Sequence, residues 1–188
     1  MSTIASNSHI TPEELLDLPD GVSFELVDGK LLERNMGMRS SRIAATLVGL
    51  ITAFLANRRL GFLFGPDAGY QCFKDDPTKV RKPDVSFIKL GRLPGDKEPL
   101  GHCPIPPDLA VEVLAPGDLA YEIDQKVAEY LKAGVPLVWV VNPDARTIRI
   151  HRPRSSTAGN VSQLTDADTL AGEDVLPGFS CLVRDIFA

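Results

Sequence analysis

The stretch from residue 107 to residue 142, PDLAVEVLAPGDLAYEIDQKVAEYLKAGVPLVWVVN, constrains the fold more than any other part of the sequence. It reads as a strand, a turn, a helix and a second strand, the unit that builds a buried parallel or mixed sheet. The apolar runs on either side of the helix are typical of strands that are covered on both faces. We therefore expect an α/β protein whose mixed, twisted sheet is flanked by helices.

Two charged residues stand where this pattern calls for apolar ones. Glu112 interrupts the apolar run of the first strand, and Lys126 falls among the inward-facing apolar positions of the helix, which recur at helical spacing. An unpaired buried charge is costly, so each of these residues needs a counter-charge, a metal or a wet cleft. We therefore expect Glu112 and Lys126 to face each other across one site.

The rest of the chain supplies further helices and strands. The sequence TPEE at 11–14 combines an N-cap, a proline at the first helical position and a capping-box glutamate, and so begins a short helix to about residue 18. An Asp-Gly turn at 28–29 joins the strands 24–27 and 30–33 of a hairpin. The other predicted elements are a long helix over 39–59 closed by the glycines at 61 and 65, strands over 70–73 and 80–89, a loop over 91–107, a helix end at Gly134, a strand over 146–152, a polar loop over 153–160, and a last strand and turn over 176–187.

The composition is that of an ordinary globular protein. With 188 residues, 44% of them hydrophobic and 24% charged, the chain can bury the core of a single domain over 1–188. Its first ten residues, MSTIASNSHI, are expected to be disordered. No apolar run approaches the roughly 20 residues that cross a bilayer, and no signal peptide is recognisable, so we expect no membrane association. Cys72, Cys103 and Cys181 form no ligand pattern and indicate free thiols in a reducing cytoplasm.

The net charge of -5 argues against a protein that coats nucleic acid by bulk electrostatics, because phosphate contacts need lysine and arginine. It leaves open an enzyme that meets DNA locally, since a bound cation can neutralise clustered carboxylates. The 3 histidines are widely separated and offer little for a zinc site.

Three carboxylates lie in apolar, strand-like surroundings: Glu25, Asp84 and Glu112. Such oxygens suit Mg²⁺ or Mn²⁺, and a lysine beside them, here Lys126, orients or helps to deprotonate an attacking water and offsets charge on a phosphate. These are the groups that metal-assisted phosphodiester hydrolysis uses. A competing acid, Asp108, shares a strand face with Glu112 but lies about 13 Å from it, too far to share one ion.

The same residues carry a resemblance. Pro83-Asp84, then Glu112 in a central strand, then a lysine, resemble the PD-(D/E)XK nuclease superfamily. More narrowly, FELVDGKL, RKPDVSFI, PDLAVEVLAP, KVAEYLKAGVPLVWVVNP and LPGFSCLVRDIF are similar, in this order, to the Uma-type (Uma-two) family of restriction endonucleases. The resemblance implies a restriction-endonuclease-like core and a Mg²⁺- or Mn²⁺-dependent endonuclease that hydrolyses phosphodiester bonds of DNA.

Carried over residue by residue, the resemblance implies that Asp84 and Glu112 are metal ligands. Glu25 matches the family's first-strand acid, which implies a third ligand or a water-orienting group. Lys126 resembles a catalytic lysine that has migrated to the helix, since Leu114 stands where the parent superfamily has lysine. Proteins with such folds frequently act as symmetric dimers, so a homodimer is expected by analogy.

Two departures from the family pattern concern the surroundings of the site. The family often has histidine where this chain has Ser40, and commonly has aspartate where this chain has Glu122. They leave the expected metal ligands intact, and the change at Ser40 falls in the predicted long helix.

Other interpretations stay open. A nucleic-acid- or protein-binding module on the same fold, without turnover, fits the acidic balance and the missing histidine, and a hydrolase of another phosphoester would share the fold. Glu112 and Lys126 can form a purely structural salt bridge. The arginines at 146, 149, 152 and 154 either touch phosphates or form a charged outer face of a strand, and Asp118 and Asp124 are interpreted as solvated surface.

Overall fold

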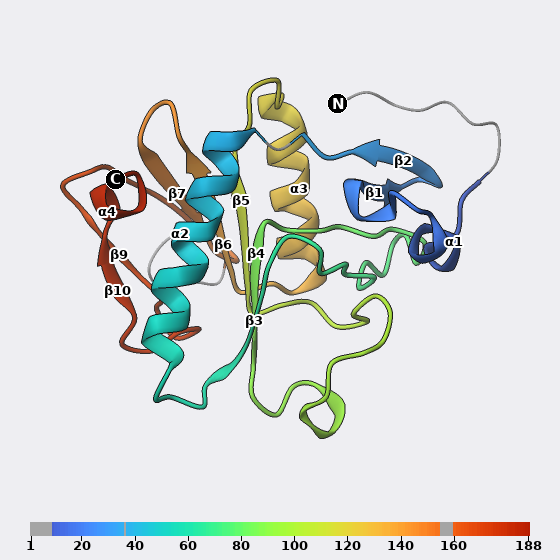
Figure 1. Ribbon diagram of the computed structural model, residues 1–188, viewed down its shortest axis with the longest axis horizontal. Helices are drawn as coiled ribbons and strands as arrows, with labels where there is room; N and C mark the ends of the chain where they lie inside the picture. The colour runs from blue at the N-terminus through green and yellow to red at the C-terminus, as the bar shows by residue number, and fades with distance from the viewer. Residues whose placement is uncertain (1–8, 36, 155–159) are drawn as a thin grey trace.

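The computed structural model describes residues 9–35, 37–154 and 160–188, and its centre is a six-stranded sheet (Figure 1). The strands follow the order β3-β4-β5-β6-β7-β8, and every neighbouring pair is antiparallel except β5 and β6, which are parallel. The predicted mixed sheet is therefore confirmed. Its strands are β3 (Gly61–Phe64), β4 (Val85–Lys89), β5 (Leu109–Val113), β6 (Leu137–Asn142), β7 (Thr147–His151) and β8 (Val161–Leu164).

The parallel pair arises from the strand–helix–strand unit that the sequence predicts. Helix α3 (Ala120–Ala133) carries the chain from β5 back to the start of β6. It ends at Gly134, whose left-handed backbone (φ 101°) lets its N–H reach the carbonyls of Leu131 and Tyr130. The predicted helix end is thus confirmed, and β5 and β6 pair in the register that places Glu112 opposite Val140.

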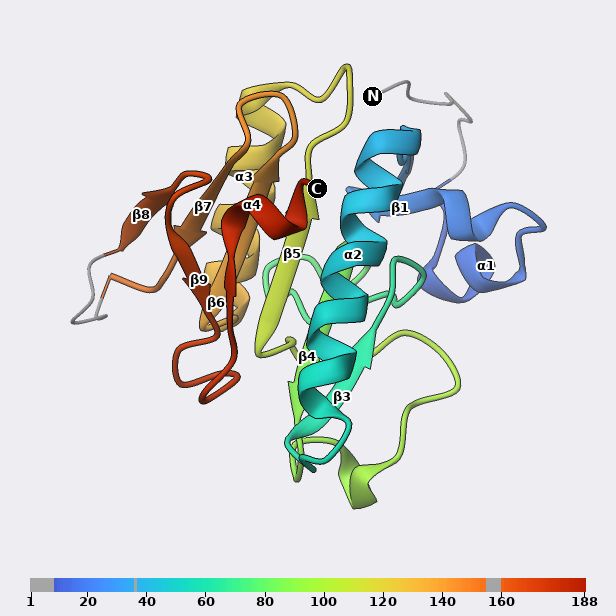
Figure 2. The ribbon, with the colours of Figure 1, turned by 60° about the vertical axis from the view of Figure 1, so that its left-hand side comes forward.

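The sheet is covered on both faces, as Figures 1 and 2 show, by α2 (Met38–Leu55) on one side and α3 on the other. By strand alternation, Val111 belongs to the core under α2, whereas Ala110 belongs to the core under α3. Glu112, two residues from Ala110, is directed toward α3 for the same reason. The sheet therefore delivers one carboxylate of its central strand to the inner face of α3.

Helix α2 is long and apolar enough, by length and composition alone, to cross a membrane. Its Ile43, Leu47 and Ile51 are fully buried against the sheet, each burial contributing about 1.5–3 kcal/mol. A core helix passes the same test of length and composition, so α2 alone does not indicate a membrane span.

The N-terminal segment forms a small unit beside α3 (Figure 1). It consists of α1 (Pro12–Asp17), with the predicted capping box between Thr11 and Glu14, the short 3-10 turn η1 (Gly21–Ser23), and the predicted hairpin of β1 (Phe24–Val27) and β2 (Lys30–Glu33). A backbone bridge between Leu26 and Val80 ties the hairpin to the chain that leads into β4. Of the first ten residues, for which disorder is predicted, 1–8 lie outside the described residues.

The C-terminal segment completes the core on the α2 side. The predicted last strand is β10 (Ser180–Leu182), which pairs with β9 (Thr169–Ala171), and the turn after it is a short helix, α4 (Val183–Ile186). Phe179 stacks on the fully buried Trp139 of β6, with 6.2 Å between ring centroids. Part of the predicted polar loop, 155–159, lies outside the described residues.

Some element boundaries differ from the prediction. The strand predicted over 70–73 is wrong: Tyr70 forms only isolated bridges, because the chain already turns at Phe73, whose carbonyl accepts the Asp76 N–H. The strand predicted over 80–89 begins at Val85 as β4, since Pro83 has no N–H to offer to a ladder. The long helix ends at Leu55 rather than 59, and the segment taken as its closure is the edge strand β3. The short strands β8 and β9 are not predicted at all. In the predicted loop over 91–107 the only regular element is the short 3-10 turn η2 (Pro94–Asp96).

Candidate active site

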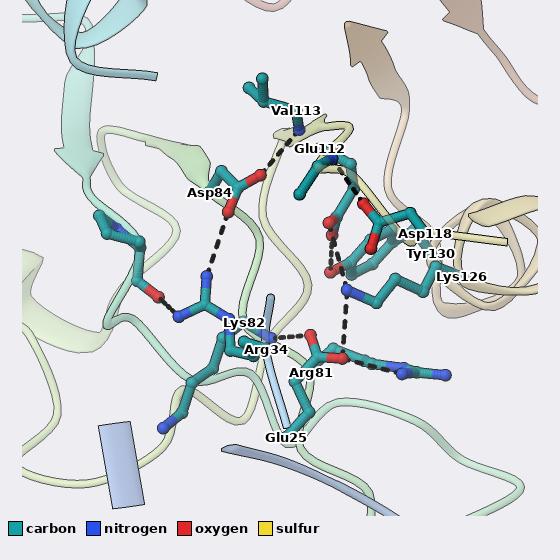
Figure 3. A network of polar contacts seen from close by, with 12 residues as sticks. Glu25, Arg34, Arg81, Lys82, Asp84, Glu112, Val113, Asp118, Lys126 and Tyr130 are labelled. Carbon is teal, nitrogen blue, oxygen red and sulfur yellow. Dashed lines mark hydrogen bonds and ion pairs between the residues drawn. The ribbon is translucent and has the colours of Figure 1, made fainter. Parts of the chain in front are cut away.

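Glu112 and Lys126 face each other, as the sequence predicts (Figure 3). Lys126 Nζ lies 3.2 Å from Glu112 Oε2, and the hydroxyl of Tyr130, one turn further along α3, donates to Glu112 Oε1 at 2.8 Å. Both charged side chains are buried, with 5% exposure each. The pair forms because β5 turns Glu112 toward the helical face that carries Lys126 and Tyr130.

Asp84 lies beside Glu112 because β4 and β5 are antiparallel neighbours. The Asp84 N–H donates to the Val111 carbonyl, and the Val113 N–H donates to Asp84 Oδ2 at 2.7 Å. The other oxygen, Oδ1, accepts from Arg34 Nη2 at 3.2 Å, and Arg34 is in turn held by the Pro66 carbonyl. The two acids predicted as metal ligands therefore meet at the ends of adjacent strands.

Glu25 lies on the other side of Lys126 and is fully buried. Its Oε2 forms an ion pair with Lys126 Nζ at 3.1 Å and accepts from Arg81 Nη1 at 2.9 Å, and its Oε1 accepts from the Lys82 N–H at 2.8 Å. An edge-strand glutamate is usually solvated, but here the bridge between β1 and the segment before β4 encloses it. Lys126 consequently joins two carboxylates, those of Glu25 and Glu112.

The charges within this cluster shift the pKa values in opposite directions. Burial alone would raise the pKa of Glu25, but Lys126 and Arg81 lower it to about 2. Burial raises the pKa of Glu112 to about 7, although the positive charge of Lys126 acts to lower it. Burial also raises the pKa of Asp84, although the hydrogen bond from the Val113 N–H and the charge of Arg34 act to lower it. Burial would lower the pKa of Lys126, but Glu112 and Glu25 raise it, so the side chain stays an ammonium and serves as a donor rather than a base.

A cavity of about 30 Å³ lies between these groups, with the carboxylates of Asp84, Glu112 and Asp118 and the cations Arg34 and Lys126 in its walls. This volume admits one water or ion. The interpretation of Asp118 as solvated surface is wrong: it is half-buried, and its Oδ2 accepts the Ala115 N–H at 2.8 Å.

The cavity walls fit a hard divalent cation. Each ionised carboxylate offers about four lone-pair directions, so Asp84 and Glu112 keep acceptor capacity beyond their present hydrogen bonds. Mg²⁺ is typically held by one or two carboxylates and keeps several waters. Within the described residues no group of three or more His, Cys, Asp or Glu side chains is placed to hold a metal, and Glu25 does not line the cavity. Two carboxylates that could hold an ion, those of Asp84 and Glu112, thus line this cavity, and the role of Glu25 as a third ligand stays a prediction.

Other candidates from the sequence lie elsewhere. Asp108 pairs with Arg92 at 2.9 Å and accepts the Lys89 N–H, away from the cavity. The arginines predicted either for phosphates or for a charged face engage acids of this chain: Arg146 with Asp166, Arg149 with Asp124 and Arg152 with Glu173. Ser40, at the position where a histidine is often found, is buried and donates to the Leu114 carbonyl.

Sequence reasoning missed Arg34 and Asp118. Arg34 follows β2 as one charged residue among several, and nothing in its neighbourhood marks it as a partner of Asp84, which is 50 residues away. Asp118 did carry a weak signal, because Pro116-Gly117-Asp118 directly follows a buried strand, where loops at the ends of strands often line sites.

Glu25 makes the stability of the fold depend on pH. A folded-state pKa lowered from 4.5 to about 2 contributes stability that is present above pH 4.5 and lost as the pH falls toward 2, by about 3 kcal/mol at 1.36 kcal/mol per unit. The free energy of unfolding should therefore exceed that of the Glu25→Gln variant most at neutral pH, and this difference should shrink by about that amount toward pH 2. Urea titrations across this range measure it, and a constant difference would contradict it.

Comparisons with known proteins agree with this architecture. The model of a family named Uma2, described as "Putative restriction endonuclease", matches residues 12–184. Among solved structures, one titled "Crystal structure of a putative nuclease belonging to DUF820 from Anabaena variabilis ATCC 29413" superposes with a TM-score of 0.77 at 22% sequence identity, covering 95% of this chain and 97% of that one. At this identity the likeness shows a shared fold. No curated protein matches.

Proposed function

The chain belongs to the Uma2 family, and from this premise we propose that it is a metal-dependent endonuclease that hydrolyses phosphodiester bonds of DNA. The observation that carries the proposal is the meeting of Asp84 and Glu112 in one small cavity with the Lys126 ammonium. An acidic pair of this kind would be expensive to bury for structure alone.

Asp84 and Glu112 would hold the cation, with Mg²⁺ or Mn²⁺ as the ions that suit an oxygen site. When bound, such an ion supplies Lewis acidity toward the phosphate and the attacking water. Lys126, held as an ammonium, would donate hydrogen bonds to that water or to a phosphate oxygen and offset negative charge there. Arg34, whose guanidinium lies in the same cavity wall, is a second cation available to the phosphate.

Glu25 takes a different role in this proposal. Its oxygens are engaged by Arg81, the Lys82 amide and Lys126, so it fixes the position and protonation of Lys126 rather than contacting the substrate. We further propose, by analogy with such folds, that the protein acts in the cytoplasm as a homodimer.

A cleavage assay tests the proposal. Supercoiled plasmid and short single-stranded, duplex and branched DNAs are incubated with the protein in Mg²⁺, in Mn²⁺ and in chelator, with Asp84→Asn purified in parallel. We expect metal-dependent cutting by the native protein and none by the variant. Equal cutting by both would identify a contaminant or another site. Cutting of small phosphodiesters alone would instead support a different phosphoesterase.

The same samples separate the nuclease from a binding module. A non-catalytic module would bind DNA without cutting it, and Glu112→Ala would leave that binding unchanged. In the nuclease, Glu112→Ala would remove both Mn²⁺ binding and cleavage while the protein still folds. Fluorescence anisotropy of labelled DNA and a Mn²⁺ titration measure the two quantities independently.

A further inference from the structure

A second pocket, of about 230 Å³, lies on the side of Lys126 that faces the β1–β2 hairpin. Lys126 lines both this pocket and the small cavity of the candidate active site, so the two adjoin. The pocket is somewhat smaller than the roughly 300–1,000 Å³ that holds a drug-sized ligand. Its size suits one small planar group placed next to whatever Lys126 contacts.

Tyr121 gives the pocket an exposed aromatic wall. The residue occupies the first turn of α3 and is 65% exposed, so its ring is not required by the core. Its hydroxyl donates to Glu122 Oε1 at 3.3 Å, which joins the two side chains at the pocket wall. An exposed ring beside a site for phosphate chemistry is a platform on which a base can stack.

Glu122 gives the pocket an unsatisfied acceptor. Its Oε2 is shielded from solvent and has no hydrogen-bond partner among the residues that the structure describes. A buried polar atom without a partner costs free energy, and an ionised carboxylate can only accept hydrogen bonds. The oxygen therefore calls for a donor from outside the chain, which a rotation of the half-buried Glu122 side chain would let it meet in the pocket. The neighbouring Gln125 amide and Lys30 ammonium add further polar groups to the walls.

We propose that this pocket binds one unpaired nucleobase that carries an exocyclic amino group, next to the phosphate that the enzyme attacks. The base would stack on Tyr121, and its amino group would donate to Glu122 Oε2, as glutamate accepts from the amino group of cytosine elsewhere. Thymine has no exocyclic amino group and would bind more weakly. This inference rests on the proposed function and narrows its substrate.

The substrate class follows from the parts of the base that the pocket would contact. In a duplex the faces of a base are covered by its stacked neighbours, so the ring of Tyr121 could not stack on a base without extrusion of the nucleotide. The substrate is therefore single-stranded DNA, or a junction or damaged site where a base is already unpaired. On ordinary duplex DNA the enzyme should cut more slowly, because it must first unstack the base.

Binding of mononucleotides tests the pocket without any cleavage. Amide NMR spectra are recorded in chelator during titration with dGMP, dAMP, dCMP and dTMP. We expect shifts around Tyr121 and Glu122, with dTMP weakest. Tyr121→Ala should weaken binding at least about 5-fold, and Tyr121→Phe, which keeps the ring, should not. Glu122→Gln should remove the preference over dTMP, because an amide both donates and accepts.

The matched control is Asp124→Asn, which changes an exposed carboxylate of the same helix that pairs with Arg149 instead of lining the pocket. It should leave every affinity unchanged. The inference is overturned if all four nucleotides bind equally and regardless of Tyr121→Ala, or if none shifts these residues, in which case a water alone satisfies Glu122.

The proposed base pocket and the proposed nuclease activity can be tested independently. Nucleotide binding at Tyr121 and Glu122 without cleavage of any DNA would uphold the pocket and refute the nuclease. Cleavage whose rate and base preference are the same in Tyr121→Ala and Glu122→Gln as in the native enzyme would uphold the nuclease and refute the pocket. Sequencing of the ends produced from a random single strand reads that preference directly.

Discussion

Asp84→Asn is expected to lower the rate of DNA cleavage by at least about 10³-fold, because removing a ligand sacrifices several kcal/mol of charge stabilisation and each 1.36 kcal/mol is tenfold. The fold should survive. The asparagine carbonyl can still accept the Val113 N–H, and Arg34 keeps its bond to the Pro66 carbonyl. A buried charge is removed at the same time, so the free energy of unfolding should change by no more than about 1 kcal/mol.

The measurements are cleavage rate, Mn²⁺ affinity by calorimetry and urea unfolding. Asp108→Asn is the matched control, since Asp108 also follows a proline, is also buried and is paired with an arginine, but lies away from the cavity. It should keep metal binding and cleavage. If Asp84→Asn binds Mn²⁺ and cuts DNA as well as the native protein, Asp84 is not a ligand and the proposed site is wrong.

The sequence predicts the pair of Glu112 and Lys126 because local periodicity alone marks both residues as out of place. A strand turns every second side chain to the same face, and a helix brings positions four apart together, so two misplaced charges on consecutive elements must meet. Local periodicity is not enough to place Asp84 in the site. Only the family resemblance connects it with β5, a strand 25 or more residues away in the chain. Because β4 and β5 are direct neighbours, the structure places Asp84 beside Glu112, and its role as a metal ligand stays a prediction.

The surroundings of Glu25, by contrast, could not be read from the sequence. Its burial depends on the backbone bridge from Leu26 to Val80, which brings Arg81 against it from across 56 residues. Leu26 belongs to the β1–β2 ladder, but Val80 belongs to no strand and forms only this isolated bridge. No periodic pattern in the sequence therefore predicts the bridge. The same reason explains why Arg34 was missed: a single long-range ion pair leaves no trace in local spacing.

Lys126→Met is expected to have the second large effect, on stability and on catalysis at once. Removing the ammonium leaves the buried carboxylate of Glu112 with Tyr130 alone and takes one of two cations from Glu25, which should cost about 3–5 kcal/mol of unfolding free energy. In the double variant Lys126→Met/Glu112→Gln the uncompensated charge disappears. Its loss should therefore be at least about 1 kcal/mol smaller than the sum of the two single losses.

The metal titration then separates the structural from the catalytic role of Lys126. Methionine in place of the ammonium removes a positive charge from the wall of the cavity while Asp84 and Glu112 stay, so Mn²⁺ should bind at least as tightly as in the native protein. Cleavage should nevertheless fall by about 10²-fold or more, the usual cost of losing a donor aimed at developing charge. This is the opposite pattern to Asp84→Asn, which loses the metal and keeps its stability. A folded Lys126→Met protein that binds Mn²⁺ and cuts DNA at the native rate would reduce Lys126 to a structural counter-ion, and the chemistry would then rest on Arg34 and the metal ligands alone.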